Sequence, residues 1–381
     1  MKIAYVSTYD PSSQLHWSGL GSNMAKALEN QGYDLSYISH LYENNKFLLN
    51  LKKAYYQYVK NQIFYRDRQP SVAKDFATQI NRKLSGLAPD ILFSPGSIPI
   101  AQLEHDAPIV FWTDSSFNGL IDYYPEFTGL CDETVRNGNM LEQKALDNCA
   151  MAIYSSQWAA NDAIEFYNID PKKVKIVPFG ANLKVDRGLK DIEAIVSSKD
   201  FSTCELLFIG VDWERKGGDT VMKIAKKLHT NGTPVRLTII GCETPKSVAE
   251  SPLTEIHGFI DKDSSKGRAI IDTCLLRAHF LVVPSIAECF GIVYAEANSF
   301  GVPSIGRQTG GVEDAIKNGV NGMTFHFDAP IDSYCAFIEG YFNDRSKYRD
   351  IALNSFNEYE TRLNWNSAGQ LVKSHLNTLL S

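Results

Sequence analysis

Short apolar runs alternate with helix-length amphipathic runs along almost the whole chain, and this alternation limits the possible folds more than any other feature. The apolar runs are rich in Ile, Val, Leu, Phe and Tyr without strict alternation, which is typical of strands buried on both faces of a parallel sheet. Parallel strands need crossover helices, so the sequence predicts repeated βαβ units with right-handed crossovers. The predicted strands are Lys2–Thr8, Asp34–His40, Asp90–Ser94, Pro108–Thr113, Met151–Ser155, Val174–Phe179, Glu205–Gly210, Val235–Gly241, Glu255–Phe259, His279–Pro284, Pro303–Gly306 and Met323–Phe327.

The chain has 381 residues, too many for one hydrophobic core, and its length suits two domains. The alternation weakens over Lys184–Ser202 and then starts again, so we expect the domain boundary there. The predicted fold class is α/β, with two Rossmann-like, doubly wound parallel-sheet domains, over residues 1–185 and 203–360, facing each other across a cleft. A last helix, within 361–381, could pack back on the N-terminal domain. Ligands of open α/β sheets bind where strands end, so we expect the chemistry in the loops that follow strands.

The composition argues against several classes of function. Lys and Arg number 38 against 44 Asp and Glu, which gives a formal net charge of -6 and makes nucleic acid a poor candidate partner. No run is apolar enough to span a bilayer, and the start, MKIAYVSTYD, lacks the apolar core of a secretory signal, so we expect a cytoplasmic protein. The seven Cys form no C-x-x-C pair and the eight His no H-E-x-x-H pattern, so no metal site is expected.

The segment PSIAECFGIVYAE, which follows a predicted strand and opens a helix, indicates the chemistry most clearly. Glu288 would lie in the loop and Glu296 about two helical turns later, so the carboxylates could lie about 10 Å apart along one ligand. Carboxylates accept hydrogen bonds from paired sugar hydroxyls. The backbone N–H groups of Phe290, Gly291 and Ile292 lie at the predicted helix start, where they would favour a phosphate. Two acids eight residues apart are common as surface acids, but this combination at a strand-to-helix turn is much rarer.

This segment resembles the E-x7-E signature of the retaining glycosyltransferases of family 4, which have the GT-B fold. The downstream run GVPSIGRQTGGVEDAI, which begins at Gly301, resembles the next strand and the Gly-Gly loop of that family. The resemblance covers nearly all of the second domain and mainly the ends of the first. It implies a GT-B fold in which the C-terminal domain binds a nucleotide sugar and the N-terminal domain binds the acceptor.

Two further motifs resemble the same family. Arg215 and Lys216 follow a predicted strand, and the resemblance implies that they hold the leaving nucleoside diphosphate, although such a pair could also be solvated on a loop. Gly19 and Gly21, in the run LHWSGLGSN, resemble the Gly-rich loop that approaches donor phosphate and acceptor. A dinucleotide fingerprint is a poorer match, because Met24 stands where its third glycine should be. A plain helix-capping loop stays open as an alternative.

Asp114 follows the predicted strand Pro108–Thr113, at a place where many family members carry a His beside the reacting sugar. This departure leaves two interpretations. Asp114 could bind a hydroxyl of the donor sugar or the acceptor, or stabilise positive charge that develops near the anomeric carbon. It could equally be a helix N-cap before Ser115.

The resemblance implies a retaining glycosyltransferase that moves a hexosyl unit from a UDP- or GDP-linked sugar to a hydroxyl of a glycan, a lipid-linked or a small-molecule acceptor. Glu296 would bind the ribose hydroxyls and Glu288 would lie near the hexose. Arg215 and Lys216 would stabilise the diphosphate in place of a metal, so no cofactor is expected. The alternatives are a nucleotide-sugar epimerase or phosphorylase on the same fold, and a catalytically silent nucleotide-sugar-binding subunit.

The stretch 41–70 combines basic and aromatic residues. Such a segment could touch an anionic membrane surface or a lipid-linked acceptor. The alternative, which the sequence favours, is a helix that packs its Leu and Tyr face on the sheet and leaves its lysines in solvent.

Overall fold

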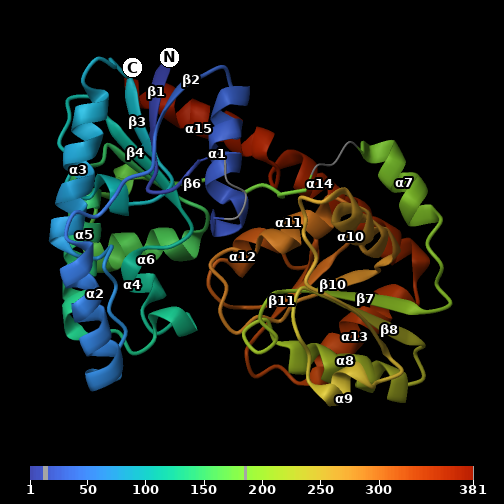
Figure 1. Ribbon diagram of the computed structural model, residues 1–381. Helices are drawn as coiled ribbons and strands as arrows, with labels where there is room; N and C mark the ends of the chain where they lie inside the picture. Colours follow the sequence, from blue (N-terminus) through green and yellow to red (C-terminus); the bar gives the residue numbers. More distant parts are fainter. Residues whose placement is uncertain (12–15, 184–186, 381) are drawn as a thin grey trace. The chain divides into compact units, whose positions relative to one another are not determined.

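A computed structural model describes residues 1–11, 16–183 and 187–380. The chain forms two compact units, the first made of Met1–Pro178 with Trp365–Ser381 and the second of Phe179–Asn364. Each unit is built on its own six-stranded sheet, and the strands pair in parallel throughout both sheets (Figure 1). The predicted α/β class with two parallel-sheet domains is therefore confirmed.

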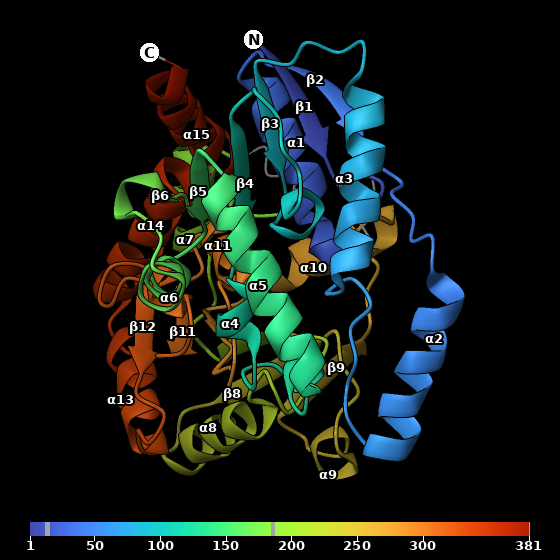
Figure 2. The ribbon, with the colours of Figure 1, turned by 90° about the vertical axis from the view of Figure 1, so that its left-hand side faces the viewer.

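The sheet of the first unit has the strand order β2-β1-β3-β4-β5-β6. The central strands are apolar and β4 is buried at every position, whereas the edge strands β2 and β6 are largely exposed or half-buried. Helices α1 and α15 cover one face of this sheet, and α3 and α5 cover the other (Figures 1 and 2). The strands are β1 (Lys2–Val6), β2 (Asp34–Ile38), β3 (Ile91–Ser94), β4 (Ile109–Thr113), β5 (Met151–Tyr154) and β6 (Val174–Ile176). The α-helices are α1 (Leu20–Asn30), α2 (Lys46–Tyr55), α3 (Pro70–Leu84), α4 (Phe117–Leu120), α5 (Asp132–Asn148), α6 (Gln157–Tyr167) and α15 (Trp365–Leu380).

The sheet of the second unit has the strand order β12-β11-β10-β7-β8-β9. The strands are β7 (Cys204–Ile209), β8 (Val235–Ile240), β9 (Thr254–Gly258), β10 (Phe280–Val282), β11 (Ser304–Arg307) and β12 (Gly322–Phe325). The α-helices are α7 (Leu189–Ser197), α8 (Gly218–Thr230), α9 (Lys246–Ala249), α10 (Ser265–Arg277), α11 (Ile292–Asn298), α12 (Val312–Ala315), α13 (Ile331–Phe342) and α14 (Arg345–Thr361). Each predicted strand is present, with ends that shift by a few residues.

The C-terminal helix α15 packs on α1 within the first unit. Lys373 Nζ donates to the backbone carbonyl of Gln31 at 2.9 Å, and the ring of Trp365 meets that of Trp112 edge-on at 5.8 Å. The units divide between Pro178 and Phe179, whereas the sequence analysis placed the boundary after residue 185. Part of the expected linker, Lys184–Ser202, is the helix α7, which packs on α14 in the second unit.

The described residues contain no helix with the length and apolar character that crossing a bilayer requires. All seven cysteines are buried as thiols.

Candidate functional site

The topological switch point of the second unit lies between β7 and β10, because the chain leaves β7 for β8 on one side and returns to β10 on the other. Open α/β sheets bind ligands at the carboxyl ends of the strands at such a point. The loop after β7 carries Arg215 and Lys216, and the loop after β10 carries Glu288. Between them Gly217 has a φ of 78°, and a Cβ atom there would collide with the carbonyl oxygen of Pro284. The close approach of the two loops therefore requires glycine.

Glu288 pairs with both cations of the neighbouring loop. The residue is 8% exposed, and its Oε2 atom forms an ion pair with Lys216 Nζ and lies 3.8 Å from Arg215 Nη1. The hydroxyl of Ser285 donates to the same oxygen at 3.3 Å. The structure thus brings together three residues that the sequence analysis selected. Arg215 and Lys216 pair with the Glu288 carboxylate here. A diphosphate offers the same kind of anionic oxygen, so it could replace the carboxylate as their partner.

The loop of Arg215 is held firmly against the loop of Glu288. The backbone N–H of Arg215 donates to the carboxylate of Asp212 at 2.9 Å, and its Nη1 donates to the carbonyl of Ala287 at 3.0 Å. The N–H of Ile286 donates to the carbonyl of Arg215 at 2.7 Å. The alternative of a solvated charge pair is wrong, because neighbouring backbone and carboxylate groups engage both cationic side chains.

Helix α11 begins within the three residues expected to hold a phosphate. Gly291 is its N-cap, with a φ of 85°, and Ile292 is its first residue. The ring of Phe290 is buried and packs edge-on against Phe179 at 5.5 Å. The Phe290 side chain therefore belongs to the core, and only its backbone is suited to meet a ligand.

Glu296, on α11, is bound to a lysine that the sequence analysis did not select. The residue is 1% exposed, and both of its carboxylate oxygens accept hydrogen bonds from Lys262 Nζ at 2.7 Å. Lys262 lies in the loop after β9, and its side chain is 42% exposed. Its signal in the sequence was only a cation shortly after a strand, at the sheet edge where the other loops gather. Glu296 is not a surface acid, because burial and the ion pair fix it inside the second unit.

The loop after β11 is hydrogen-bonded to the loop of Glu288. The N–H of Gly311 donates to the backbone carbonyl of Glu288 at 3.2 Å, and the Thr309 hydroxyl donates to that of Ile286 at 3.0 Å. The Gly-Gly loop predicted from the sequence therefore helps to position Glu288, through a hydrogen bond between the two backbones.

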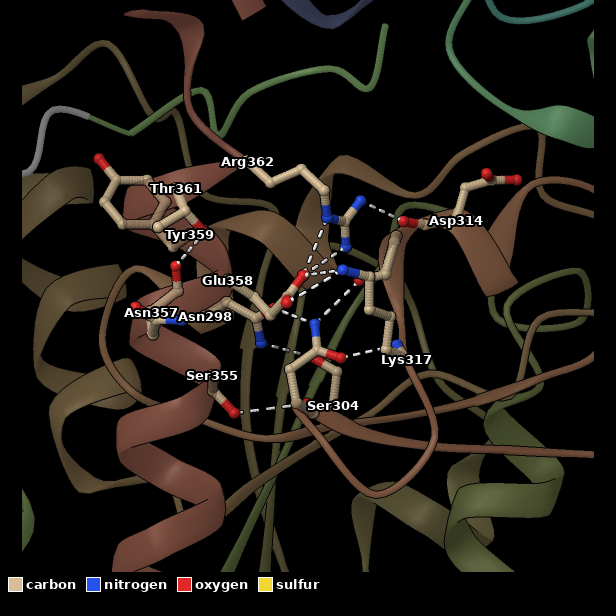
Figure 3. A network of polar contacts seen from close by, with 12 residues as sticks. Asn298, Ser304, Asp314, Lys317, Ser355, Asn357, Glu358, Tyr359, Thr361 and Arg362 are labelled. Carbon is tan, nitrogen blue, oxygen red and sulfur yellow. Dashed lines mark hydrogen bonds and ion pairs between the residues drawn. The ribbon is translucent and has the colours of Figure 1, made fainter. Parts of the chain in front are cut away.

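A polar network anchors the far end of this loop to α14 (Figure 3). Glu358 accepts hydrogen bonds from Lys317 Nζ at 3.1 Å and from Arg362 Nε at 2.8 Å, and Arg362 also donates to the carbonyl of Asp314 on α12. Burial acts to raise the pKa of Glu358, but the hydrogen bonds and charges of Lys317 and Arg362 hold that pKa below its usual value. The carboxylate therefore stays charged, and the network fixes the loop that in turn contacts Glu288.

The first unit contains a pocket of about 710 Å³. It lies at the carboxyl ends of β1, β3 and β4, beside the switch point between β1 and β3. Asp114 lines this pocket and accepts a hydrogen bond from Trp17 Nε1 at 3.3 Å. The following helix α4 is capped by Ser116, whose hydroxyl accepts from the N–H of Gly119 at 3.0 Å. The interpretation of Asp114 as the helix N-cap is therefore wrong.

The Gly-rich loop leads into α1 beside the same pocket. Gly19 is the N-cap of α1, and the carbonyl of Gly21 accepts a hydrogen bond from the Tyr5 hydroxyl at 2.7 Å. A Cβ atom on Gly21 would lie 2.5 Å from the hydroxyl oxygen of Tyr9. Any larger residue at this position would therefore collide with the Tyr9 ring. Leu15, the first residue of the run selected in the sequence, lies outside the described residues.

Two pocket residues, Tyr9 and Glu142, were not selected from the sequence. Glu142 lies on α5 and is 2% exposed, and its Oε2 accepts a hydrogen bond from the hydroxyl of Ser97. Burial raises the pKa of the Glu142 carboxyl, against the opposing charge of Arg68. Burial, with the nearby Asp114 carboxylate, raises the pKa of Tyr9 to about 12. A mid-helix Glu reads like any surface acid, so only the fold reveals its position.

Comparison with protein families decides the affiliation of the chain. The family model described as Glycosyltransferase Family 4 matches residues 22–185, and that described as Glycosyl transferases group 1 matches residues 196–357. The chain belongs to the family 4, group 1 glycosyltransferases. The resemblance drawn from the E-x7-E segment is thereby confirmed.

Curated relatives of this family 4 chain include D-inositol 3-phosphate glycosyltransferases. That of Corynebacterium glutamicum is 25% identical over 201 residues, which cover 50% of this chain and 48% of the relative. That of Gordonia bronchialis is 28% identical over 199 residues, which cover 48% and 42%. The match thus spans about half the length of the curated relatives.

Solved structures resemble the family 4 chain over nearly its full length. A sucrose-phosphate synthase from Thermosynechococcus elongatus has a TM-score of 0.70 at 17% identity, with 99% of this chain and 98% of that chain covered. Anabaena HepE, solved in complex with UDP, has a TM-score of 0.64 at 14% identity, with 99% and 100% covered. The predicted GT-B fold is confirmed.

Proposed function

We propose that the chain is a retaining glycosyltransferase that moves a hexosyl unit from a UDP- or GDP-linked sugar to a hydroxyl of a glycan, a lipid-linked or a small-molecule acceptor. The observation that carries the proposal is the contact of Arg215 and Lys216 with Glu288 at the switch point of the second unit. Two cations gathered there suit a diphosphate, and the carboxylate between them suits the hydroxyls of the attached sugar.

The proposed reaction needs no protein nucleophile. The acceptor oxygen attacks the anomeric carbon from the face that the leaving group occupies, and the bond from that carbon to the diphosphate oxygen breaks. The departing phosphate takes the proton of the acceptor hydroxyl. Arg215 and Lys216 stabilise the negative charge that grows on the diphosphate, so their contribution is larger in the transition state than in the ground state. Glu296 binds the ribose hydroxyls, and Asp114, in the first unit, meets the acceptor or the hexose.

The test uses variants of the two cations. Arg215→Ala and Lys216→Ala should each lower kcat by about 10²–10³-fold, as expected for the loss of one donor to a developing oxyanion. Lys246→Ala is the matched control. That side chain is 86% exposed, and its ion pair with Glu250, four residues later, is long, at 3.5 Å. Full activity of both cation variants on UDP- and GDP-sugars would contradict the diphosphate assignment.

A thermal-shift panel of UDP, GDP and their sugars supplies the donor identity, since a ligand that binds the folded chain raises its stability by mass action. The anomeric configuration of the product, read by NMR, tests retention. An epimerase would convert the donor without an acceptor, a phosphorylase would require inorganic phosphate, and a silent subunit would bind the donor without turnover. The family matches are to glycosyltransferases and do not favour these alternatives.

We also propose that the chain contacts an anionic membrane surface through an apolar stripe. The stripe consists of the side chains of Phe47, Leu48, Leu51, Tyr55, Tyr58 and Val59, on α2 and on the π-helical segment η2 (Tyr56–Lys60) that follows it. Only Leu49 of α2 is buried, whereas Phe47 is 73% and Tyr58 80% exposed. The sequence favoured a helix that packs its Leu and Tyr face on the sheet. Leu49 and Tyr56 do pack on the core, but the side chains of the stripe are exposed. Residues 46–60 contain four Lys and no acid. Apolar side chains beside cations fit the interface of an anionic bilayer.

Liposome flotation tests the contact. The chain should float with vesicles that contain phosphatidylglycerol and much less with phosphatidylcholine alone. The variant Phe47→Ser with Tyr58→Ser should lose flotation, while the control Phe166→Ser with Phe259→Ser, which changes exposed aromatic side chains elsewhere, should keep it. Equal flotation of all three chains would remove the proposal, and a loss of self-association in the first variant would instead mark the stripe as a contact between copies.

A further inference from the structure

We propose that the pocket of the first unit binds an uncharged polyol, a sugar or cyclitol with free hydroxyls and no phosphate, and that Tyr9 and Glu142 hydrogen-bond to it. The inference rests on the proposed function, because it names the acceptor class of the same enzyme. It differs from the acceptor named for the curated relatives, which is an inositol phosphate.

The pocket has the size and position of a ligand site. Its volume of about 710 Å³ lies within the range of small-molecule sites. Its lining comes from the loops after β1, β3 and β4, from residues 41–46 and 67–68, and from α3, α4 and α5. All of these elements belong to the first unit. The described residues that line the pocket therefore all belong to one unit.

Two polar atoms of this pocket lack a hydrogen-bond partner among the described residues. Glu142 Oε1 is buried and accepts no hydrogen bond of ordinary geometry from residues 1–11, 16–183 and 187–380. The same carboxyl is engaged by Ser97 through Oε2, and the nearby backbone N–H of Phe117 helps to lower its pKa, against the larger effect of burial. The hydroxyl of Tyr9 is buried and equally without a hydrogen-bond partner among the described residues. Buried polar groups in native proteins nearly always find partners, so a pair of such groups in one pocket points to a ligand that supplies them.

The two groups restrict the chemistry of that ligand. An ionised carboxylate only accepts hydrogen bonds, so Glu142 needs a donor, and a phenol can donate or accept. A hydroxyl of a polyol donates to a charged Glu142 and accepts from a protonated one, so it suits either state. A phosphate at neutral pH offers mainly acceptor oxygens and would face the carboxylate with like charge.

The other charges of the pocket agree with a neutral ligand. Four acids line it, and only two cations do: Glu43, Asp67, Asp114 and Glu142 against Lys46 and Arg68. The Arg68 guanidinium stacks 4.4 Å from the centre of the Phe117 ring, and Lys46 is exposed. A phosphate would thus enter a pocket in which carboxylates outnumber ammonium and guanidinium groups, whereas hydroxyls pair with either sign.

Binding of the full chain to matched sugars tests the proposal, by saturation-transfer NMR and calorimetry in the presence of UDP. The neutral probes are methyl glucoside, lactose and myo-inositol, and the charged ones are glucose 6-phosphate and inositol phosphate. We expect at least one neutral probe to bind and each phosphorylated counterpart to bind at least about 10-fold more weakly. Tighter binding of a phosphorylated probe, or no binding of any neutral probe, would overturn the proposal.

Two variants separate this pocket from general stability. Tyr9→Phe should weaken binding of the neutral probe by about 5-fold or more without lowering the melting temperature, because the hydroxyl that it removes has no partner among the described residues. Tyr33→Phe is the matched control: its hydroxyl is also buried without a partner in the described chain, but Tyr33 does not line the pocket, so binding should not change. Glu142→Gln should weaken the same binding by about 10-fold or more.

The affinity for UDP keeps the two proposals apart. Neither Tyr9→Phe nor Glu142→Gln should change it, since the donor groups lie in the second unit. Sugar binding without any UDP binding would refute the donor assignment and still support the polyol site in the pocket. UDP binding with equal sugar affinity for Tyr9→Phe, Tyr33→Phe and the unaltered chain would refute the pocket alone.

Discussion

Replacement of Lys262 by Met gives a sharp test of how the second unit holds a nucleotide. The ammonium of Lys262 donates to both oxygens of Glu296, and no other hydrogen bond to that carboxylate is present in the described chain. Removal of one partner of a buried ion pair costs about 3–5 kcal/mol. The Lys262 side chain is 42% exposed, so water reaches part of the pair and we expect the lower cost of about 2–3 kcal/mol.

This cost converts into a measurable change in melting temperature. A loss of 1 kcal/mol lowers Tm by about 2–4 °C in a body the size of the second unit, so Lys262→Met should melt roughly 4–12 °C lower. Lys262→Met with Glu296→Gln removes the stranded charge as well and should recover most of the difference, since a neutral amide is far cheaper to bury. Lys266→Met, which changes a nearby cation on α10 with no such carboxylate partner in the described residues, is the matched control.

The same variant reports on the ribose assignment. If ribose hydroxyls bind Glu296, they replace the donors that Lys262→Met has removed, and they no longer compete with an ammonium. A saturating amount of UDP should therefore raise Tm more in Lys262→Met than in the unaltered chain, in differential scanning calorimetry at matched concentrations. An equal or smaller rise would refute the placing of ribose at Glu296, and an unchanged Tm without ligand would refute the energetic argument itself.

Three further expectations follow from other parts of the chain. Turnover should persist in EDTA, because the proposed mechanism puts Arg215 and Lys216 where a metal would otherwise act, and strict metal dependence in a kinetic assay would contradict it. Burial, helped by the charge of Lys199, lowers the pKa of His279 to about 3, so between pH 6.5 and 3 the unfolded chain binds a proton that the folded chain does not. Stability should thus fall as pH drops below 6.5, by about 2 kcal/mol from this group at pH 5, and denaturant titrations of His279→Gln should show a weaker acid loss than the parent. Glu358→Gln should cost about 1–3 kcal/mol in chemical unfolding, because Lys317 and Arg362 lose a charged acceptor; equal midpoints and slopes would show that the network adds nothing.

The strands were predictable because most of them are local, nearly continuous apolar runs. The loops that carry Arg215, Lys216 and Glu288 were predictable for the same reason, since a residue just after a parallel strand must lie at the carboxyl edge of the sheet. The division between Pro178 and Phe179 was harder to see, because it depends on packing between distant segments, such as α7 on α14.

Side chains outside these loops could not be assigned from sequence in the same way. Lys262 lies in the loop after β9 and Glu296 on α11, and their spacing of 34 residues carries no periodic signal. Glu142 occupies the middle of α5, where an acid normally faces water. The apolar stripe was expected to be buried, and it is exposed. Amphipathic spacing shows that one face of a helix is apolar, but not whether the protein itself covers that face.

All seven thiols are buried, so the folded protein should not react with maleimides and similar thiol reagents. Replacement of Tyr58, at the exposed end of the apolar stripe, by cysteine would then allow a fluorophore or spin label to be attached at this position alone. Depth quenching from such a label would locate the stripe within a bilayer. The native thiols would react only as the chain opens, so one preparation could report membrane docking and global unfolding through separate labels.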